Sequence, residues 1–75
     1  MNKELEANQE KFKKILGTYV KHAGLEIELT LKDGKKLVIS KKRELQGDFL
    51  IQTPKGGAQE LIPLQEIQRA DIYAV

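Results

Sequence analysis

The hydrophobic pattern of the chain changes period once, and this change constrains the fold more than any other feature. Over residues 25–31, leucine or isoleucine occupies every odd position, and glutamate or threonine occupies the positions between. Successive side chains of a β-strand point to opposite faces, so this alternation predicts a strand with one buried face. Asp33-Gly34 follows, and this pair predicts a two-residue hairpin into a second strand that contains Leu37 and Ile39.

Before this run, the apolar residues follow the helical period instead. They recur at spacings of three, four and seven, which predicts an amphipathic helix over residues 1–23. Gly24 suits the C-terminal cap of such a helix. Gly17 lies inside it and marks either a kink or a close contact with the strands. The residues of the apolar face are Leu5, Phe12, Ile15, Leu16, Tyr19, Val20 and Ala23.

Turn residues divide the rest of the chain into three further short strands. Residues 46–48 form a turn, and a third strand covers residues 49–51. Residues 61–62 form a fourth strand, which ends at a proline, and residues 64–67 form one tight helical turn. A fifth strand covers residues 70–73.

Five short antiparallel strands close most readily into a barrel, because closure removes exposed strand edges. We therefore predict one mainly β domain over residues 1–75. Its N-terminal helix, residues 1–23, caps one open end of a five-stranded antiparallel SH3-like (Sm-like) barrel, residues 24–75. The length of 75 residues leaves room for one domain only.

Positive charge gathers in residues 32–43, which hold six basic residues against one acidic residue. The remainder of the chain has seven basic and ten acidic residues. A hairpin with this charge is able to follow a phosphate backbone, so we predict that its cations contact nucleic acid. Two other interpretations remain: a solvated edge whose lysines prevent aggregation, or a contact with an acidic protein. The six cations are Lys32, Lys35, Lys36, Lys41, Lys42 and Arg43.

The chain contains four aromatic residues, and base stacking needs exposed rings. Phe12 and Tyr19 lie on the apolar face of the predicted helix, so we assign them to the core. Phe49 follows a turn and is the ring best placed for stacking. Tyr73 fits either environment. So few aromatic residues favour contact with the phosphate backbone over a base-stacking sheet.

Few residues are suited to catalysis or to metal binding. The chain has no cysteine and one histidine, His22, whose position suits an interaction with helix C-terminal carbonyls. Ser40 is the only serine and has no candidate base beside it. We predict no enzyme, no cofactor and no metal site.

No apolar stretch approaches the roughly 20 residues that a membrane span needs. The N-terminus is charged and lacks the apolar core of a signal peptide. A cytoplasmic protein with no membrane contact is the corresponding expectation.

A helix followed by five bent antiparallel strands resembles the Sm-like family of RNA-binding small barrels. The segment LEIELTLKDGKKL is similar to the first hairpin of that family. The second half looks closest to the C-terminal barrel of the bacterial ribosome maturation factor, through Gly47-Asp48, Gly56-Gly57, Ile62-Pro63-Leu64, Ile67 and Ala70. The resemblance covers residues 24–74. The chain departs from the family at Val38-Ile39-Ser40, which lacks the glycine that bends the second strand, and it lacks the histidine-containing RNA-binding turn near residues 62–67.

We therefore expect a small binding module for RNA or for ribosome-associated surfaces, with the contact on residues 32–43. The alternative is a protein-interaction or homo-oligomeric assembly module without a nucleic-acid role. In that case the fourth and fifth strands pair with those of a neighbouring subunit, as in ring-forming relatives. The subunit contact then includes Leu61, Ile62, Leu64 and Ile72.

Overall fold

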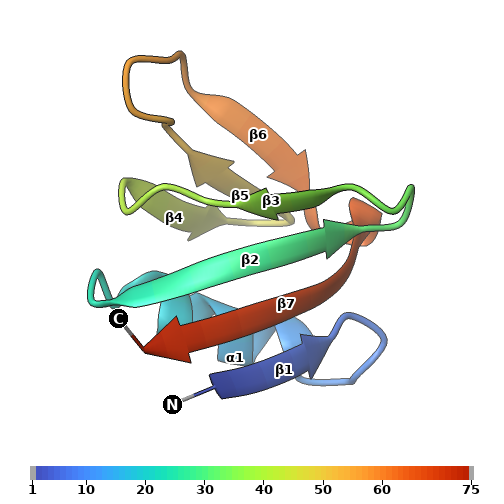
Figure 1. Cartoon of the computed structure of the whole chain (residues 1–75). Helices are drawn as coiled ribbons and strands as arrows, with labels where there is room; N and C mark the ends of the chain where they lie inside the picture. The colour runs from blue at the N-terminus through green and yellow to red at the C-terminus, as the bar shows by residue number, and fades with distance from the viewer. Residues whose placement is uncertain (1, 75) are drawn as a thin grey trace.

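The computed structural model describes residues 2–74, with side chains from residue 3 onward. The described chain is mainly β, as predicted, with one α-helix, and its strands form two antiparallel sheets (Figure 1). Sheet A has the strand order β1-β7-β2-β3, and sheet B has the order β4-β5-β6. In chain order the elements are β1 (Asn2–Glu6), α1 (Phe12–Val20), β2 (Leu25–Leu31), β3 (Lys36–Val38), β4 (Arg43–Gln46), β5 (Phe49–Gln52), β6 (Glu60–Pro63), the 3-10 turn η1 (Leu64–Glu66) and β7 (Ile67–Ala74).

The predicted N-terminal helix is wrong in its first half. Residues 2–6 form β1, which pairs antiparallel with β7 and places Leu5 opposite Ala70 in the core. A helix over the same residues would bury almost nothing between Leu5 and Phe12, because only Ala7 is apolar there. The strand instead covers a free edge of β7, and α1 begins at Phe12, where the apolar residues become dense.

The hairpin between β2 and β3 has a longer loop than the predicted two residues. The Leu31 N–H donates to the Lys35 carbonyl at 2.8 Å, so three residues lie in the loop. The Gly34 N–H donates to the Leu31 carbonyl at 2.9 Å, and Gly34 has a φ of 93°. This combination is a turn followed by a glycine bulge, in which the glycine supplies the left-handed position.

Two differences change the predicted five strands into the observed seven. One is the added strand β1. The other is a break in the predicted second strand, which leaves sheet A after Val38 and enters sheet B at Arg43. The sheets of the described chain also do not close into a barrel. Closure would need the edge strands of sheet A, β1 and β3, to pair with the edge strands of sheet B, and they do not. β7 is itself paired with β1 and β2, so it has no edge left for β6.

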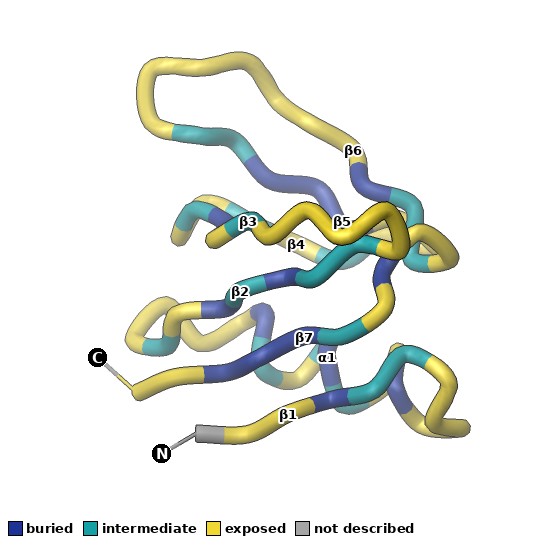
Figure 2. The backbone as a smooth tube through the Cα atoms, turned by 45° about the vertical axis from the view of Figure 1, so that its right-hand side comes forward, coloured by how far each residue is buried: buried dark blue, intermediate teal, exposed yellow. Residues whose placement is uncertain are grey.

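The core lies between the inner face of sheet A, helix α1 and the inner face of sheet B. Figure 2 shows the buried segments of β1, β2, β7 and α1 gathered there, whereas the hairpin of β5 and β6 rises away from them with an exposed loop. The side chains buried in this cluster are Leu5, Phe12, Leu16, Val20, Ile27, Leu29, Ile39, Leu50, Ile62, Ile67, Ala70 and Ile72.

Helix α1 approaches sheet B closely at one point. A Cβ atom added to Gly17 would lie 3.2 Å from Cδ2 of Leu45 on β4. Of the two interpretations of Gly17, the structure supports the close contact. The helix in the described part of the chain is neither long nor apolar enough to cross a membrane.

Candidate nucleic-acid interface

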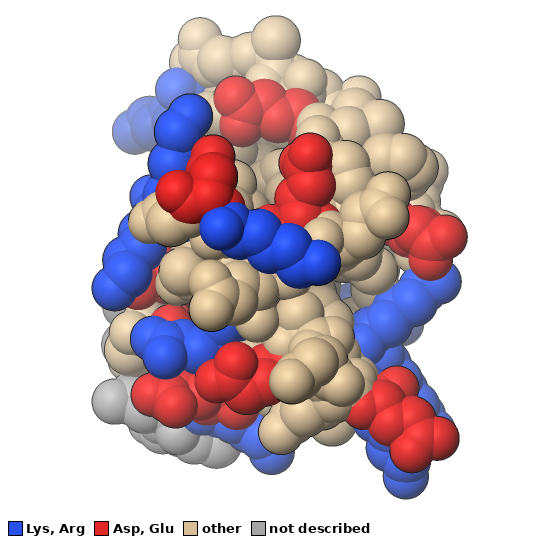
Figure 3. All heavy atoms as spheres, turned by 90° about the vertical axis from the view of Figure 1, so that its right-hand side faces the viewer, with Lys and Arg blue, Asp and Glu red and all other residues tan. Residues whose placement is uncertain are grey.

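The basic segment 32–43 does not form one surface, because β3 separates its two ends. Lys32, Lys35 and Lys36 lie at the hairpin between β2 and β3, and the other three cations lie at the break between β3 and β4. At the hairpin the Lys32 N–H donates to the Glu66 carbonyl at 2.9 Å, which brings η1 beside the lysines. Figure 3, which faces this side of the molecule, shows basic and acidic side chains interspersed. The hairpin is therefore a mixed-charge surface.

Arg43 points into the protein. Its Nε donates to the Val20 carbonyl at 3.1 Å, and its Nη2 donates to the carbonyls of His22 and Leu25 at 2.8 and 2.9 Å. Val20 ends α1, His22 lies in the turn after it, and Leu25 begins β2, so this side chain joins the end of the helix to the start of the next strand. Burial lowers the pKa of Arg43 from its ordinary value. The prediction that Arg43 contacts phosphate therefore needs correction: its side chain caps the helix.

Lys41 is divided between the start of β2 and solvent. Its Nζ donates to the Leu25 carbonyl at 2.9 Å, although the residue is exposed. An ammonium group has three donors, so Lys41 retains donors for a ligand. Lys42, the next residue, is also exposed.

Ser40 holds the chain in place at the break between the sheets. Its hydroxyl donates to the Thr53 carbonyl at 2.7 Å and accepts the Lys42 N–H at 3.0 Å. Its N–H donates to Oε1 of Gln52 at 2.9 Å, and Nε2 of Gln52 donates to Glu60 at 2.7 Å. Gln52 is buried, so its two bonds are partly protected from water. This polar network therefore holds the break between β3 and β4 in place.

The loop between β5 and β6 brings Lys55 to the same place. The Gly57 N–H donates to the Pro54 carbonyl at 2.9 Å, and Gly56 has a φ of 75°, as in a type II turn. Lys55 occupies the exposed corner of this turn.

These residues line a concave surface of about 460 Å³, which we call the bend groove. It consists of residues 40–42 and 53–57, and it contains Lys41, Lys42 and Lys55 but no carboxylate. Sequence reasoning missed Lys55 because it stands alone in the chain; the turn signal Pro54-Lys55-Gly56-Gly57 was the available clue.

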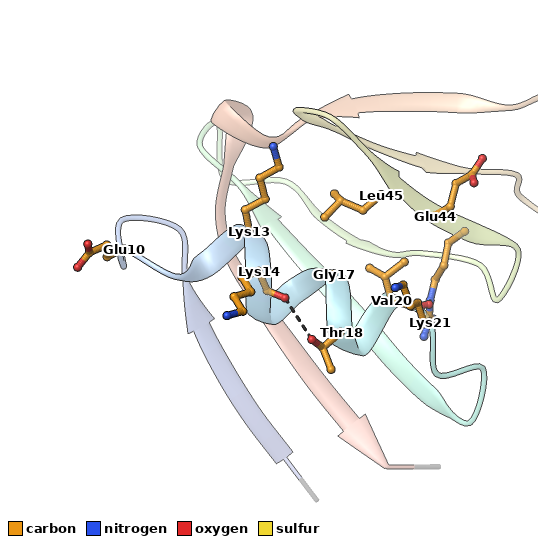
Figure 4. A pocket seen from close by; sticks show the side chains of 10 residues that line it. Glu10, Lys13, Lys14, Gly17, Thr18, Val20, Lys21, Glu44 and Leu45 are labelled. Atoms are coloured by element: carbon orange, nitrogen blue, oxygen red, sulfur yellow. Dashed lines mark hydrogen bonds between the residues drawn. The ribbon is translucent and has the colours of Figure 1, made fainter.

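A larger open groove of about 790 Å³ lies between α1 and β4 (Figure 4). Its basic residues face two carboxylates, Glu10 and Glu44, and Lys13 forms an ion pair with Asp48 at 3.1 Å. The Thr18 hydroxyl is bonded to the Lys14 carbonyl at 3.2 Å (Figure 4). The two signs of charge make this groove less suited to a polyanion than the bend groove.

The predicted stacking residue and subunit contacts lie in different environments. Phe49 is 42% exposed, as a stacking ring requires, and Leu61 is 56% exposed. Ile62 and Ile72 are buried in the core, and Leu64 is half-buried against it. Of the four predicted contact residues, therefore, Leu61 alone is an exposed side chain.

The strand edges also bear on assembly. β7 is paired on both sides, so it offers no edge to a neighbouring subunit. The ring-like pairing predicted for the last two strands is thus blocked at β7 by β1. β6 is an edge strand of sheet B and remains open.

No protein-family model matches this chain, and no curated protein matches it in sequence. Among the described residues, no group of three or more His, Cys, Asp or Glu side chains is placed to hold a metal ion. The described residues form a small two-sheet β domain with a basic bend groove that no carboxylate lines.

Proposed function

We propose that this domain is a non-catalytic module that binds RNA through the bend groove. The observation that carries the proposal is the lining of this groove: three lysines on a concave surface with no carboxylate among them. Lys42 and Lys55 neutralise phosphates. Lys41 uses one donor of its ammonium group for the Leu25 carbonyl and offers the others to the ligand. Each neutralised phosphate releases counterions, which drives the binding of a polyanion.

The frame of the groove favours a phosphate ligand over a looser electrostatic contact. Ser40 and Gln52 fix the break between the strands by hydrogen bonds of 2.7–3.0 Å, so the lysines project from a rigid base. Gly56 carries no side chain at the rim, and a Cβ atom there would meet nothing within 4 Å, which leaves its main chain open to a ligand. Lys35 and Lys36 remain peripheral contributors, since they lie at the hairpin between β2 and β3 and outside the bend groove.

The proposed partner class follows from the resemblance stated above. The second half of the sequence is similar to the C-terminal barrel of the bacterial ribosome maturation factor, although the strands of the described chain do not close into a barrel. We extend the proposal on this basis to ribosomal RNA or a ribonucleoprotein surface in the cytoplasm.

The test is a fluorescence-anisotropy titration with a short labelled RNA at low salt. The double variant Lys42→Gln with Lys55→Gln removes two charges from the groove. A matched control, Lys3→Gln with Lys11→Gln, removes two charges from exposed positions outside it. We expect the first variant to weaken binding at least tenfold and the control to weaken it about twofold. Equal losses in both variants would show a contact that depends on net charge alone and would overturn the proposal.

A second candidate function, self-assembly, is favoured by one observation on β6. The Leu64 N–H donates to the Asp48 carbonyl at 2.8 Å, and hydrogen-bonded pairs alternate along an antiparallel ladder. The main-chain groups of Leu61 therefore point away from β5, toward the open edge, beside an exposed leucine side chain. Sedimentation equilibrium of the wild type and of Leu61→Lys tests this candidate: a dimer lost on substitution supports it, and a monomer at high concentration rejects it.

A further inference from the structure

We infer that the RNA is single-stranded, that it crosses the outer face of sheet B, and that one of its bases stacks on Phe49. This inference rests on the proposed function and specifies the ligand of the same site. It joins two features on one surface: the lysines of the bend groove and the exposed phenylalanine.

The register of sheet B places these features on the same face. Leu50 and Ile62 are paired and point into the core, so their neighbours along each strand point outward. Ile51 lies opposite Leu61, and Phe49 lies opposite Pro63. Ile51 is buried to 8% exposure yet is not part of the core cluster, and it lines a hollow with Lys42, Glu44 and Thr53.

The outer face continues without interruption into the bend groove. The Thr53 N–H donates to the Lys42 carbonyl at 2.9 Å, so the ladder between β4 and β5 extends to these residues. Lys42 is two residues before Glu44 on one strand, and Thr53 is two residues after Ile51 on the other. Their side chains therefore lie on the same face of the sheet, and all four residues line one hollow. From Thr53 to Phe49 is four residues, or about 13 Å along the strand.

This surface suits unpaired bases. Base faces are apolar and stack on aromatic rings, and the outer face offers Phe49 at 42% and Leu61 at 56% exposure. The loop end of the hairpin of β5 and β6 projects beyond the rest of the chain in both views (Figures 1 and 2). A duplex keeps its bases stacked inside the helix, so it cannot present one to Phe49.

Charge defines the path of the backbone across this face. Lys42 lies at the groove end, and Lys55 extends the positive charge beside the loop between β5 and β6. Glu44 lies on β4, opposite Ile51, and accepts a hydrogen bond from Gln46 at 3.0 Å. The Glu44 carboxylate repels phosphates, so the RNA backbone passes on the side of the sheet nearer to β6. Substituting Glu44→Gln is therefore expected to strengthen RNA binding severalfold.

The experiment compares single-stranded and duplex RNA of equal length by fluorescence anisotropy. Phe49→Leu removes the ring but keeps an apolar side chain. The matched control is Tyr73→Leu, because Tyr73 is an aromatic residue on sheet A that is 37% exposed. Thermal unfolding followed by circular dichroism shows that each variant is folded. We expect Phe49→Leu to weaken single-strand binding about tenfold, with duplex binding and the Tyr73→Leu variant unchanged.

Three outcomes overturn the inference, and they are distinguishable. If Phe49→Leu binds single strands as the wild type does while the Lys42 and Lys55 variant is weak, the stacking inference fails and the proposed function stands. If neither RNA binds the wild type at low salt, both fail. If Phe49→Leu abolishes a dimer and leaves RNA binding unchanged, the outer face is a contact between copies of this chain.

Discussion

The Nε of Arg43 donates to the main-chain carbonyl of Val20 at 3.1 Å, which joins the first residue of β4 to the last residue of α1 across 23 positions of sequence. The same guanidinium bonds to two further carbonyls beyond the helix. One side chain therefore satisfies acceptors that the helix end leaves free and fixes α1 against sheet B.

We predict that Arg43→Ala lowers the free energy of unfolding by about 1–3 kcal/mol, because three hydrogen bonds from a charged donor to main-chain carbonyls are lost. Arg43→Lys keeps the charge but not the planar set of donors, so it should recover part of this loss. Urea unfolding followed by circular dichroism measures both. An unchanged midpoint for Arg43→Ala would show that water replaces the guanidinium without cost.

A second buried charge lies on the outer face of sheet A. Asp71 is 4% exposed and lies between Glu28 and Glu4 across the strands, and Nε of Arg69 is 3.2 Å from its Oδ2. Asp71, by its charge and by this hydrogen bond, raises the pKa of Arg69. We predict that Arg69→Gln lowers the urea midpoint, because three carboxylates are left side by side.

The control for this prediction is Asp71→Asn in the Arg69→Gln background, which removes the stranded charge. The double variant should unfold at a higher urea concentration than Arg69→Gln alone. If the two variants have the same urea midpoint, the charge of Asp71 does not destabilise the protein when Arg69 is absent.

The sequence predicted those parts of the fold that depend on local pattern. The alternation of residues 25–31, the turn at Gly47 and the helical turn after Pro63 are all present. Two features depend on distant partners and were not predictable from local pattern. β1 forms because β7 offers an edge, and the break at Ser40 is held by Gln52 and Thr53.

The candidate site was predictable only in part, for the same reason. The basic segment indicated Lys41 and Lys42, but it could not show that Arg43 turns inward to the carbonyls of α1. Lys55 is 13 residues after Lys42 in the sequence and reaches the groove through the turn between β5 and β6. Phe49 was expected to be exposed, and its exposure was predictable because it follows a tight turn at Gly47.

The stability of the domain should depend on Tyr73 at alkaline pH. Desolvation, and then the charges of Asp71 and Glu28, raise the pKa of Tyr73. The folded protein therefore keeps the phenol proton at pH values where the unfolded chain, with a pKa near 10, has lost it. The contribution of protonated Tyr73 to the free energy of unfolding is therefore present below about pH 10. It is lost as the pH rises through the pKa of Tyr73 in the folded protein. Urea unfolding at pH 8–11 should show a shallower alkaline fall for Tyr73→Phe, and identical slopes would contradict this assignment.

Gly17 is a site where a substitution should stabilise the protein. Alanine favours a helix over glycine by up to about 1 kcal/mol, and the new Cβ meets the end of a flexible leucine side chain at 3.2 Å. Leu45 is half-buried and has room to move, so Gly17→Ala should raise the urea midpoint. Gly17→Val, with two more methyl groups at the same contact, should lower it. A lower midpoint for alanine would mean that Leu45 is fixed.

The most direct test of the account is the salt dependence of RNA binding by the wild type and by the Lys42→Gln, Lys55→Gln variant. Each phosphate contact to a single strand contributes about 0.7 to the slope of log affinity against log salt concentration, so loss of two contacts should reduce the slope by about 1.4. Parallel lines for the two proteins, or no saturable binding at low salt, would contradict the claim that the bend groove binds the phosphate backbone.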